Sequence, residues 1–160
     1  MSMIRFLMLL SLVVWVGGIV FFAFVLAPTV FHPGILPSRQ LAGQVVSRSL
    51  GILHWMGLTC GVFFLVTAML DSQVTTGFTS VFAPRNLLVF AMIVLTLISM
   101  FAISTRMLEL RNDMVLIDNV PQDDVRRVEF NRLHVWSTRL ESAVFLLGLG
   151  VVFLTARRLS

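Results

Sequence analysis

Four long hydrophobic segments, separated by shorter polar stretches, dominate the chain. They cover about residues 6–26, 50–70, 87–104 and 134–156. A helix needs roughly 20 apolar residues to cross the hydrocarbon core of a bilayer, and these segments approach that length. The pattern therefore predicts a single all-α membrane domain, residues 1–160, with four transmembrane helices in an up-down bundle.

Prolines and polar residues suggest where the helices begin and end. We expect the first helix to end at Ala27-Pro28, because the residue before a proline is disfavoured in helices. The connector that follows has room for a short amphipathic helix that Ser38 would cap. After the second hydrophobic segment, the polar residues from Asp71 to Arg85 predict a loop.

The third helix should continue beyond the bilayer, because residues 104–114 contain neither proline nor glycine. Its charged residues share one face at helical spacing: Arg106, Glu109 and Asp113. Asp118-Asn119 followed by Pro121 predicts a turn and the start of the fourth helix. We therefore expect the third and fourth helices to extend beyond the bilayer as a hairpin over about residues 105–133.

The fourth segment carries ionisable residues inside its hydrophobic run. Its uncharged part, residues 142–156, has only 15 residues, so the span must begin near His134 and take Arg139 and Glu141 into the membrane. At 100° per residue, one face collects His134, Ser137, Thr138 and Glu141. We expect this face to point into the bundle, whereas Arg139 on the opposite face should reach the connector-side interface.

His54, about one turn into the second segment, should lie at a depth similar to that of His134. The second and fourth helices of an up-down bundle are diagonal, so the two imidazoles would face each other across the core. Gly57 and Gly61 share the face of His54, and their spacing allows a close helix contact. Glu141 needs a partner from another helix or from neighbouring hydroxyl groups, or it would be uncharged.

Three interpretations of this intramembrane polar cluster, to which we add Arg106, remain open. Haem or another tetrapyrrole could be held between His54 and His134, although no cofactor is the expectation we favour. A proton or ion path could run through His134, Glu141 and His54. The interpretation we favour is structural: interhelical hydrogen bonds that fix the register of the bundle.

We expect neither a catalytic site nor a metal site. Ser137 and His134 are a pair on one helix surface, with no third orienting group and no oxyanion-hole motif. Met56, Cys60 and Met69 scatter around the second helix instead of converging on one face. Since Cys60 is the single cysteine, an intramolecular disulfide is also excluded.

The composition supports the membrane assignment, because 58% of the residues are apolar and 12% are charged, against about 25% charged in soluble domains. All 12 basic residues are arginines, and the net charge is +4. They lie at the ends of the hydrophobic segments and form no single patch. We therefore expect contacts with the lipid bilayer and no nucleic-acid binding.

The arginines also predict an orientation. The side with the termini carries Arg5, Arg85, Arg157 and Arg158. The connector side carries Arg39, Arg48, Arg106, Arg111, Arg126, Arg127 and Arg132. By the positive-inside rule, the connectors at residues 27–49 and 105–133 should be cytoplasmic and the termini outside. We expect the membrane to be a bacterial-type inner or plasma membrane.

Several short motifs occur in order along the chain. They are Trp15-Val16-Gly17-Gly18 with Phe21, Ala27-Pro28 with Phe31, Ala42-Gly43, Arg106-Met107 with Leu110-Arg111, and Phe130-xx-Leu133-His134-xx-Ser137. In these motifs the chain resembles the transmembrane-protein-205-like family, small four-helix membrane proteins built on a domain of unknown function. The family pattern favours a small residue after the histidine and an asparagine at position 141, so Val135, Arg139 and Glu141 depart from it. The resemblance implies a fold and a membrane location, and the departures suggest a specialised member adapted to a particular partner.

We expect the protein to act without catalysis as a membrane accessory or interaction subunit of a larger membrane complex. Its small size and the charged hairpin, which other membrane subunits could contact, motivate this prediction. The alternative is a small transporter or cofactor-binding protein centred on His54, His134 and Glu141.

Overall fold

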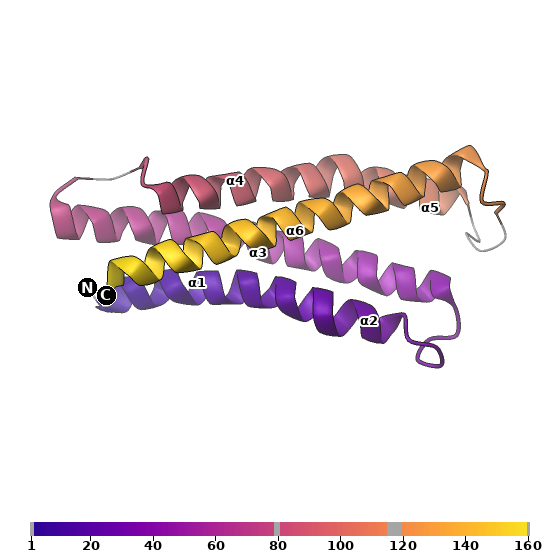
Figure 1. The fold of residues 1–160 in the computed structure, drawn as a ribbon, viewed down its shortest axis with the longest axis horizontal. Helices are drawn as coiled ribbons and strands as arrows, with labels where there is room; N and C mark the ends of the chain where they lie inside the picture. Colours follow the sequence, from indigo (N-terminus) through magenta and orange to yellow (C-terminus); the bar gives the residue numbers. More distant parts are fainter. Residues whose placement is uncertain (1, 79–80, 115–119, 160) are drawn as a thin grey trace.

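The computed structural model describes residues 2–78, 81–114 and 120–159 of the chain. Four helical rods run antiparallel to their neighbours in one bundle, and both termini lie at the same end (Figure 1). No strand occurs in the described residues. We refer to the end with the termini as the termini end and to the opposite end as the connector end.

Each rod is one continuous helical stretch. The first consists of α1 (Ser2–Phe21), the π-helical segment η1 (Phe22–Leu26) and α2 (Ala27–Val30). The second is α3 (Arg39–Thr76). The third consists of α4 (Pro84–Ile98), the π-helical segment η2 (Ser99–Ser104) and α5 (Thr105–Asp113). The fourth is α6 (Val125–Leu159).

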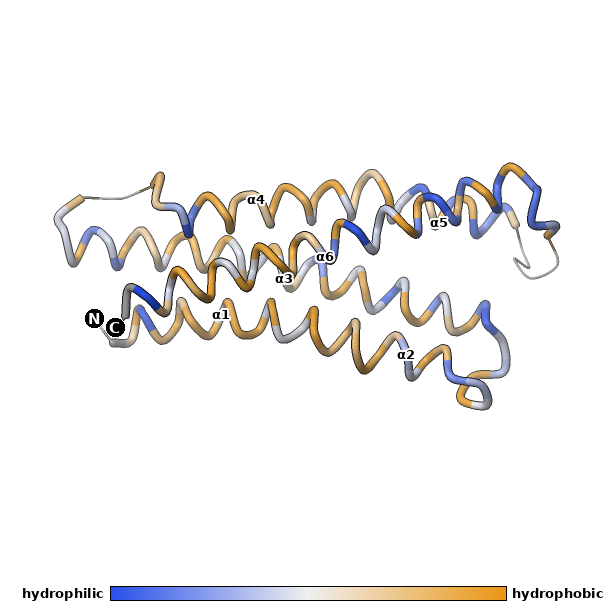
Figure 2. The backbone as a smooth tube through the Cα atoms, viewed as in Figure 1, coloured by the Kyte–Doolittle hydropathy of each residue, from blue (hydrophilic) through white to orange (hydrophobic). Residues whose placement is uncertain are grey.

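All four rods are long and apolar enough to cross a membrane, which confirms the predicted all-α membrane bundle. Hydrophobic residues cover most of α1 and α4, whereas hydrophilic residues gather around the α5–α6 connection (Figure 2). Large apolar side chains are exposed along the rods, as expected for surfaces that face lipid: Val13, Phe21, Phe63, Phe90 and Phe153. Neighbouring rods pack as α1 with α3, α3 with α4, α4 with α6 and, less extensively, α6 with α1. Hence α3 and α6 are diagonal, as predicted.

Two predicted helix ends are wrong because helical hydrogen bonding continues past them. The first rod runs through Pro28 to Val30, and the amide of Ala27 bonds to the carbonyl of Phe22 in the π-helical register. A π turn rearranges the hydrogen bonds around a proline, so the rod can continue. The predicted loop at Asp71 is helical as far as Thr76, and α3 ends at Gly77 in the left-handed conformation (φ +73°).

The connector-side helix starts agree only in part with the sequence pattern. Ser38 caps α3 as predicted, since its Oγ accepts a hydrogen bond from the amide of Leu41 at 3.2 Å. The amphipathic helix expected after it is the first part of α3 itself. The third rod continues to Asp113, as expected from the absence of breakers. The fourth helix, however, begins at Val125 and not at Pro121, while the predicted turn at Asp118-Asn119 lies outside the described residues.

Asp124 explains this later start, because it caps α6. Its carboxylate accepts hydrogen bonds from the amide of Arg126 at 2.8 Å and from the guanidinium of the same residue at 2.9 Å. These bonds lower the pKa of Asp124 to about 2. The acidic cap therefore stays charged and fixes the first turn of the helix.

Trp15 of α1 belongs to the core of the bundle and is 3% exposed. Its indole fills a notch that Gly57 and Gly61 leave on α3; a Cβ at Gly61 would lie 2.6 Å from the ring. The spacing of the two glycines predicted a close contact with another helix, and the Trp15 side chain makes that contact. Together with Phe64, Val89 and Met92, Trp15 forms an apolar layer between the two ends of the bundle.

Candidate functional site

The second and fourth helices are linked by a hydrogen-bonded pair of ionisable residues, His54 of α3 and Glu141 of α6. His54 Nε2 lies 2.6 Å from Glu141 Oε1, which is a short hydrogen bond. The His54 side chain is 2% exposed and that of Glu141 is 18% exposed. This pair gives Glu141 the interhelical partner that the sequence required, and it spans the diagonal of the bundle.

The predicted pairing of His54 with His134 is wrong. Glu141 lies about two helical turns farther along α6 than His134 and occupies the position opposite His54. The His134 residue is exposed. The prediction assumed that His54 and His134 lie equally deep, because each lies about one turn from the polar boundary of its hydrophobic segment. That assumption failed, because α3 begins at Arg39, well before the predicted boundary of its segment.

A groove of about 860 Å³ lies beside this pair in the connector half of the molecule. Its walls come from η1 and α2 on one side and from α6 on the other, with the first turns of α3 and part of α5 completing it. Figure 1 shows the reason: α1 and α6 are close at the termini end and separate toward the connector end. Several lining residues are exposed, so the groove is open to the surroundings.

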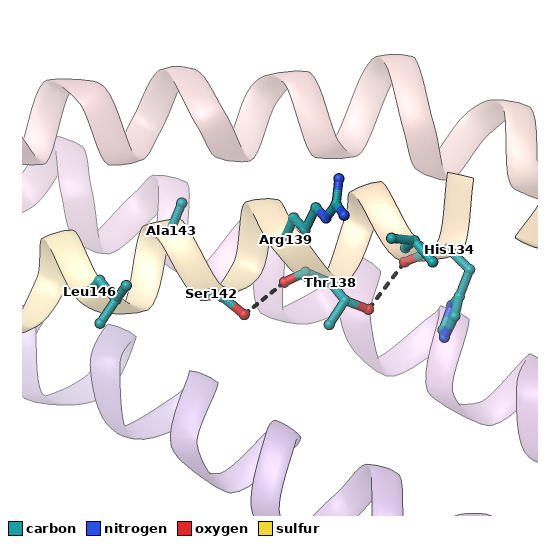
Figure 3. A pocket seen from close by; sticks show the side chains of 7 residues that line it. His134, Thr138, Arg139, Ser142, Ala143 and Leu146 are labelled. Carbon is teal, nitrogen blue, oxygen red and sulfur yellow. Dashed lines mark hydrogen bonds between the residues drawn. The ribbon is translucent and has the colours of Figure 1, made fainter. Parts of the chain in front are cut away.

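The α6 wall of the groove is polar. It presents His134, Ser137, Thr138, Glu141 and Ser142. Thr138 Oγ1 donates to the carbonyl of His134 at 3.0 Å, and Ser142 Oγ donates to the carbonyl of Thr138 at 2.9 Å (Figure 3). Both hydroxyl protons are thus used within the helix, and both hydroxyl oxygens can still accept hydrogen bonds from a ligand.

This geometry corrects the prediction that the polar face of α6 points into a closed core. Ser137 is buried and Glu141 partly buried, but His134 and Thr138 are exposed. Helical phase correctly placed these residues on one face, and Arg139 points away from Thr138 and Ser142 (Figure 3). The residues lining the shallow hollow drawn there, about 430 Å³, all belong to α6. Arg139 lies 5.3 Å from the Trp136 ring and is exposed.

The opposite wall of the groove is apolar and aromatic. Its side chains come from the first rod and the residue that follows it: Ile19, Val20, Phe22, Phe24 and Phe31. Phe145 of α6 adds a further aromatic ring to the groove. The groove therefore has two chemically different sides that face each other. A molecule with a polar and an apolar part could satisfy both at once.

Two arginines lie at the connector end of the groove. Arg111 of α5 donates from Nη1 to the carbonyl of Gly43 at 2.9 Å, and its guanidinium lies 5.5 Å from the Phe130 ring. Arg39, the first residue of α3, also lines the groove. The sequence analysis named both as connector-side arginines but not as site residues, because membership of a groove depends on how separate helices meet.

Arg106, predicted to belong to the intramembrane cluster, lies in the hairpin instead. Its guanidinium contacts Glu129 of α6 at 3.0 Å and Glu109 at 3.1 Å, and all three residues line up on the outside of α5 and α6. The predicted exposed face with Glu109 is confirmed. Arg106 thus ties the two arms of the hairpin together and is not part of the His54–Glu141 site.

Another ion pair, which the sequence analysis missed, joins the first two rods at the termini end. Arg5 Nε of α1 lies 2.9 Å from Asp71 Oδ1 of α3, and the Asp71 side chain is only 4% exposed. Arg85 and Asn86 are also buried at this end. The signal was present in the sequence, since Arg5 and Asp71 occupy the termini-side ends of two adjacent antiparallel segments.

The four apolar rods, with a polar groove between the first and the fourth, define an integral membrane protein of the four-helix type. The chain belongs to the family described as Domain of unknown function (DUF4149), which it matches over residues 10–115. This region contains His54, Arg39 and Arg111 and ends before α6. No curated protein and no solved structure matches the chain.

Proposed function

We propose that the protein is a non-catalytic membrane protein that binds an amphipathic molecule, drawn from the bilayer, in the groove between the first rod and α6. The observation that carries this proposal is the pairing of a polar α6 wall with an apolar, aromatic wall in a groove of about 860 Å³. Ligand pockets commonly have volumes of about 300–1,000 Å³.

The physical argument concerns what can fill such a groove. Lipid tails alone would leave the hydroxyl and carboxylate groups of α6 facing hydrocarbon, which is unfavourable. Water alone would wet the phenylalanines of the first rod. An amphipathic occupant avoids both costs, because its polar part can reach α6 while its chain lies on the aromatic wall.

Photo-crosslinking in vesicles tests this proposal. A mixture of phospholipids with different headgroups, each with a diazirine in the acyl chain, should label Phe22 and Phe145 in the groove more than Val13 and Phe153. The last two residues are exposed on the same rods outside the groove, so they report ordinary contact with lipid. Equal labelling of all four positions would refute the proposal.

A second candidate, an accessory subunit of a larger membrane complex, is favoured by the organisation of the hairpin. Arg106 with Glu129, and Arg126 with Asp124, hold charged side chains in fixed positions on its surface. Such a surface suits recognition by another protein, since its side chains lose little freedom on binding. The candidate predicts copurification with other membrane subunits in mild detergent; a solitary, stable monomer from native membranes would contradict it.

The proposal also covers the group within the family to which the chain belongs and the orientation of the protein in the membrane. We assign the chain to the transmembrane-protein-205-like members of its family, on the motifs around Trp15 and His134. We also propose an inner or plasma membrane with a cytoplasmic connector end, which the excess of arginines there supports. A reporter fused to the C-terminus that is active only in the cytoplasm should therefore be inactive.

The tetrapyrrole alternative has less support from the geometry. The Nε2 atom of His54 is engaged by Glu141, and His54 is not among the residues that line the groove, whereas His134 is. Binding between two histidines would require breaking the His54–Glu141 pair. A Soret band in the purified protein, lost in both His54→Ala and His134→Ala, would revive this alternative.

A further inference from the structure

We infer that the groove selects an anionic phospholipid, whose phosphate lies between Arg39 and Arg111 and whose acyl chain follows the aromatic wall toward Phe145. The inference rests on the proposed function and names its ligand class.

The charge of the groove is the first argument. Among the described residues, neither Arg39 nor Arg111 forms an ion pair with a carboxylate. By contrast, Arg5, Arg106 and Arg126 each pair with an acid. The acidic residue that lines the groove is Glu141, and it holds His54. Within the described part of the chain these two cations lack an acidic partner, and at one end of a partly apolar groove they favour an anion there.

The position of Arg111 is the second argument. Its Nη1 bond to the Gly43 carbonyl and its contact with the Phe130 ring fix the guanidinium plane against α3 and α6. The absence of a side chain at Gly43 eases this approach, because a Cβ there would make a tight contact of 3.3 Å with Nη2. The remaining N–H groups can donate to phosphate oxygens in the forked geometry for which arginine is suited.

The length of the groove is the third argument. Arg39 and Leu50 both line it and are 11 residues apart on α3, so the groove follows that helix for roughly 16 Å. Half of a hydrocarbon core about 30 Å thick is nearly the same length. A phosphate held at Arg39 therefore leaves the acyl chain in the matching leaflet, where it would lie anyway, and a second chain can remain in the surrounding lipid.

Polar side chains of the groove suit the linker between a phosphate and its acyl chains. Gln40, Ser47 and Ser137 also line the groove. They can donate to or accept from ester and glycerol oxygens. The groove thus offers cations for a phosphate, hydroxyl and amide groups for the linker, and apolar side chains for an acyl chain.

Native mass spectrometry of the full chain from vesicles of equimolar phosphatidylglycerol and phosphatidylcholine tests the inference. We expect one bound lipid per chain, with at least a tenfold preference for phosphatidylglycerol. Arg39→Gln and Arg111→Gln should each reduce this preference severalfold, whereas Arg106→Gln should leave it unchanged, because Arg106 lies outside the groove in an ion pair. If the Arg111→Gln variant does not fold because it has lost the contact to Gly43, the Arg39→Gln variant still tests the inference.

The possible outcomes separate the inference from the proposed function. Equal binding of both lipids, with acyl crosslinks still concentrated in the groove, would overturn the anionic selectivity and leave the proposed function intact. Loss of groove crosslinking for both lipids would overturn both. Displacement of phosphatidylglycerol by millimolar glycerol phosphate would show a site for a soluble phosphate and overturn the assignment to a lipid.

Discussion

The two ends of the bundle each hold a carboxylate inside a hydrophobic helix, but they expose opposite members of the pair. At the termini end the acid Asp71 is buried, and its partner Arg5 is 34% exposed. In the connector half the base His54 is buried, and the acid Glu141 is 18% exposed and lines the groove. Arg5–Asp71 can thus close an end of the protein, whereas Glu141–His54 presents its acid to whatever occupies the groove.

The packing between the rods produces this difference. At the termini end α1 and α6 lie close together (Figure 1), and the Asp71 side chain is 4% exposed. Toward the connector end the first rod leaves α6, and its π-helical segment η1 lines the opening. The Trp15 layer separates the two regions. A polar pair is therefore structural at one end and accessible at the other.

Removing the layer that separates the two ends should have the largest effect. Trp15→Ala leaves a cavity in the notch of Gly57 and Gly61 and should lower the free energy of unfolding by roughly 3–5 kcal/mol, as for other buried aromatic residues. Unfolding in SDS, followed by circular dichroism, measures it. Trp55→Ala is the matched control, since Trp55 is 59% exposed; equal losses in both variants would contradict a separating layer.

Breaking the pair at the closed end should come next. Arg5→Gln leaves the buried Asp71 carboxylate without its partner and should cost about 3 kcal/mol, the lower end of the range for buried ion pairs, because Arg5 is partly exposed. The double variant Arg5→Asp with Asp71→Arg should recover part of this loss in the same unfolding assay. If Arg5→Gln is as stable as the original chain, the termini end is not held by this pair.

Changing the acid at the open end should cost less. Glu141→Gln retains a hydrogen-bonding partner for His54, so we expect a loss of about 1 kcal/mol in the same assay. His134→Ala, an exposed residue on the same wall of the groove, should have no measurable effect on stability. If His134→Ala lowers the free energy of unfolding more than Glu141→Gln does, then Glu141 is not the residue that holds α6 against His54.

The smallest effect should occur outside the bundle, at the cap of α6. The folded pKa of Asp124, about 2, is below the usual value near 4. Its contribution is therefore complete above about pH 4 and is lost as the pH falls through 2. Amide hydrogen exchange of the first turn of α6 should show increased opening over that range. Asp124→Asn should weaken this pH dependence while keeping a cap; an unchanged profile would refute the role of Asp124.

The sequence was sufficient for those features that depend on local patterns. Segment length and polarity predicted the four helices, and Ser38 was correctly predicted as a cap. The helical phase correctly predicted that His54 faces the inside of the bundle. What lies opposite a helix face depends on the register and angle of another helix. For this reason neither the divergence of η1 from α6 nor the contact of His54 with Glu141, instead of His134, could be predicted from the sequence. Arg5–Asp71 was missed because the two residues were assigned to a helix start and to a loop.

The central claim, that the open end holds an amphipathic molecule and the closed end does not, is tested most directly by the lipid that remains bound after purification from native membranes. Native mass spectrometry without added lipid should detect one phospholipid per chain. Ala23→Trp, which fills the groove, should lose it, whereas Val13→Trp, on the exposed face of α1 outside the groove, should keep it. A chain that retains no phospholipid, or retains it equally in both variants, would contradict the claim.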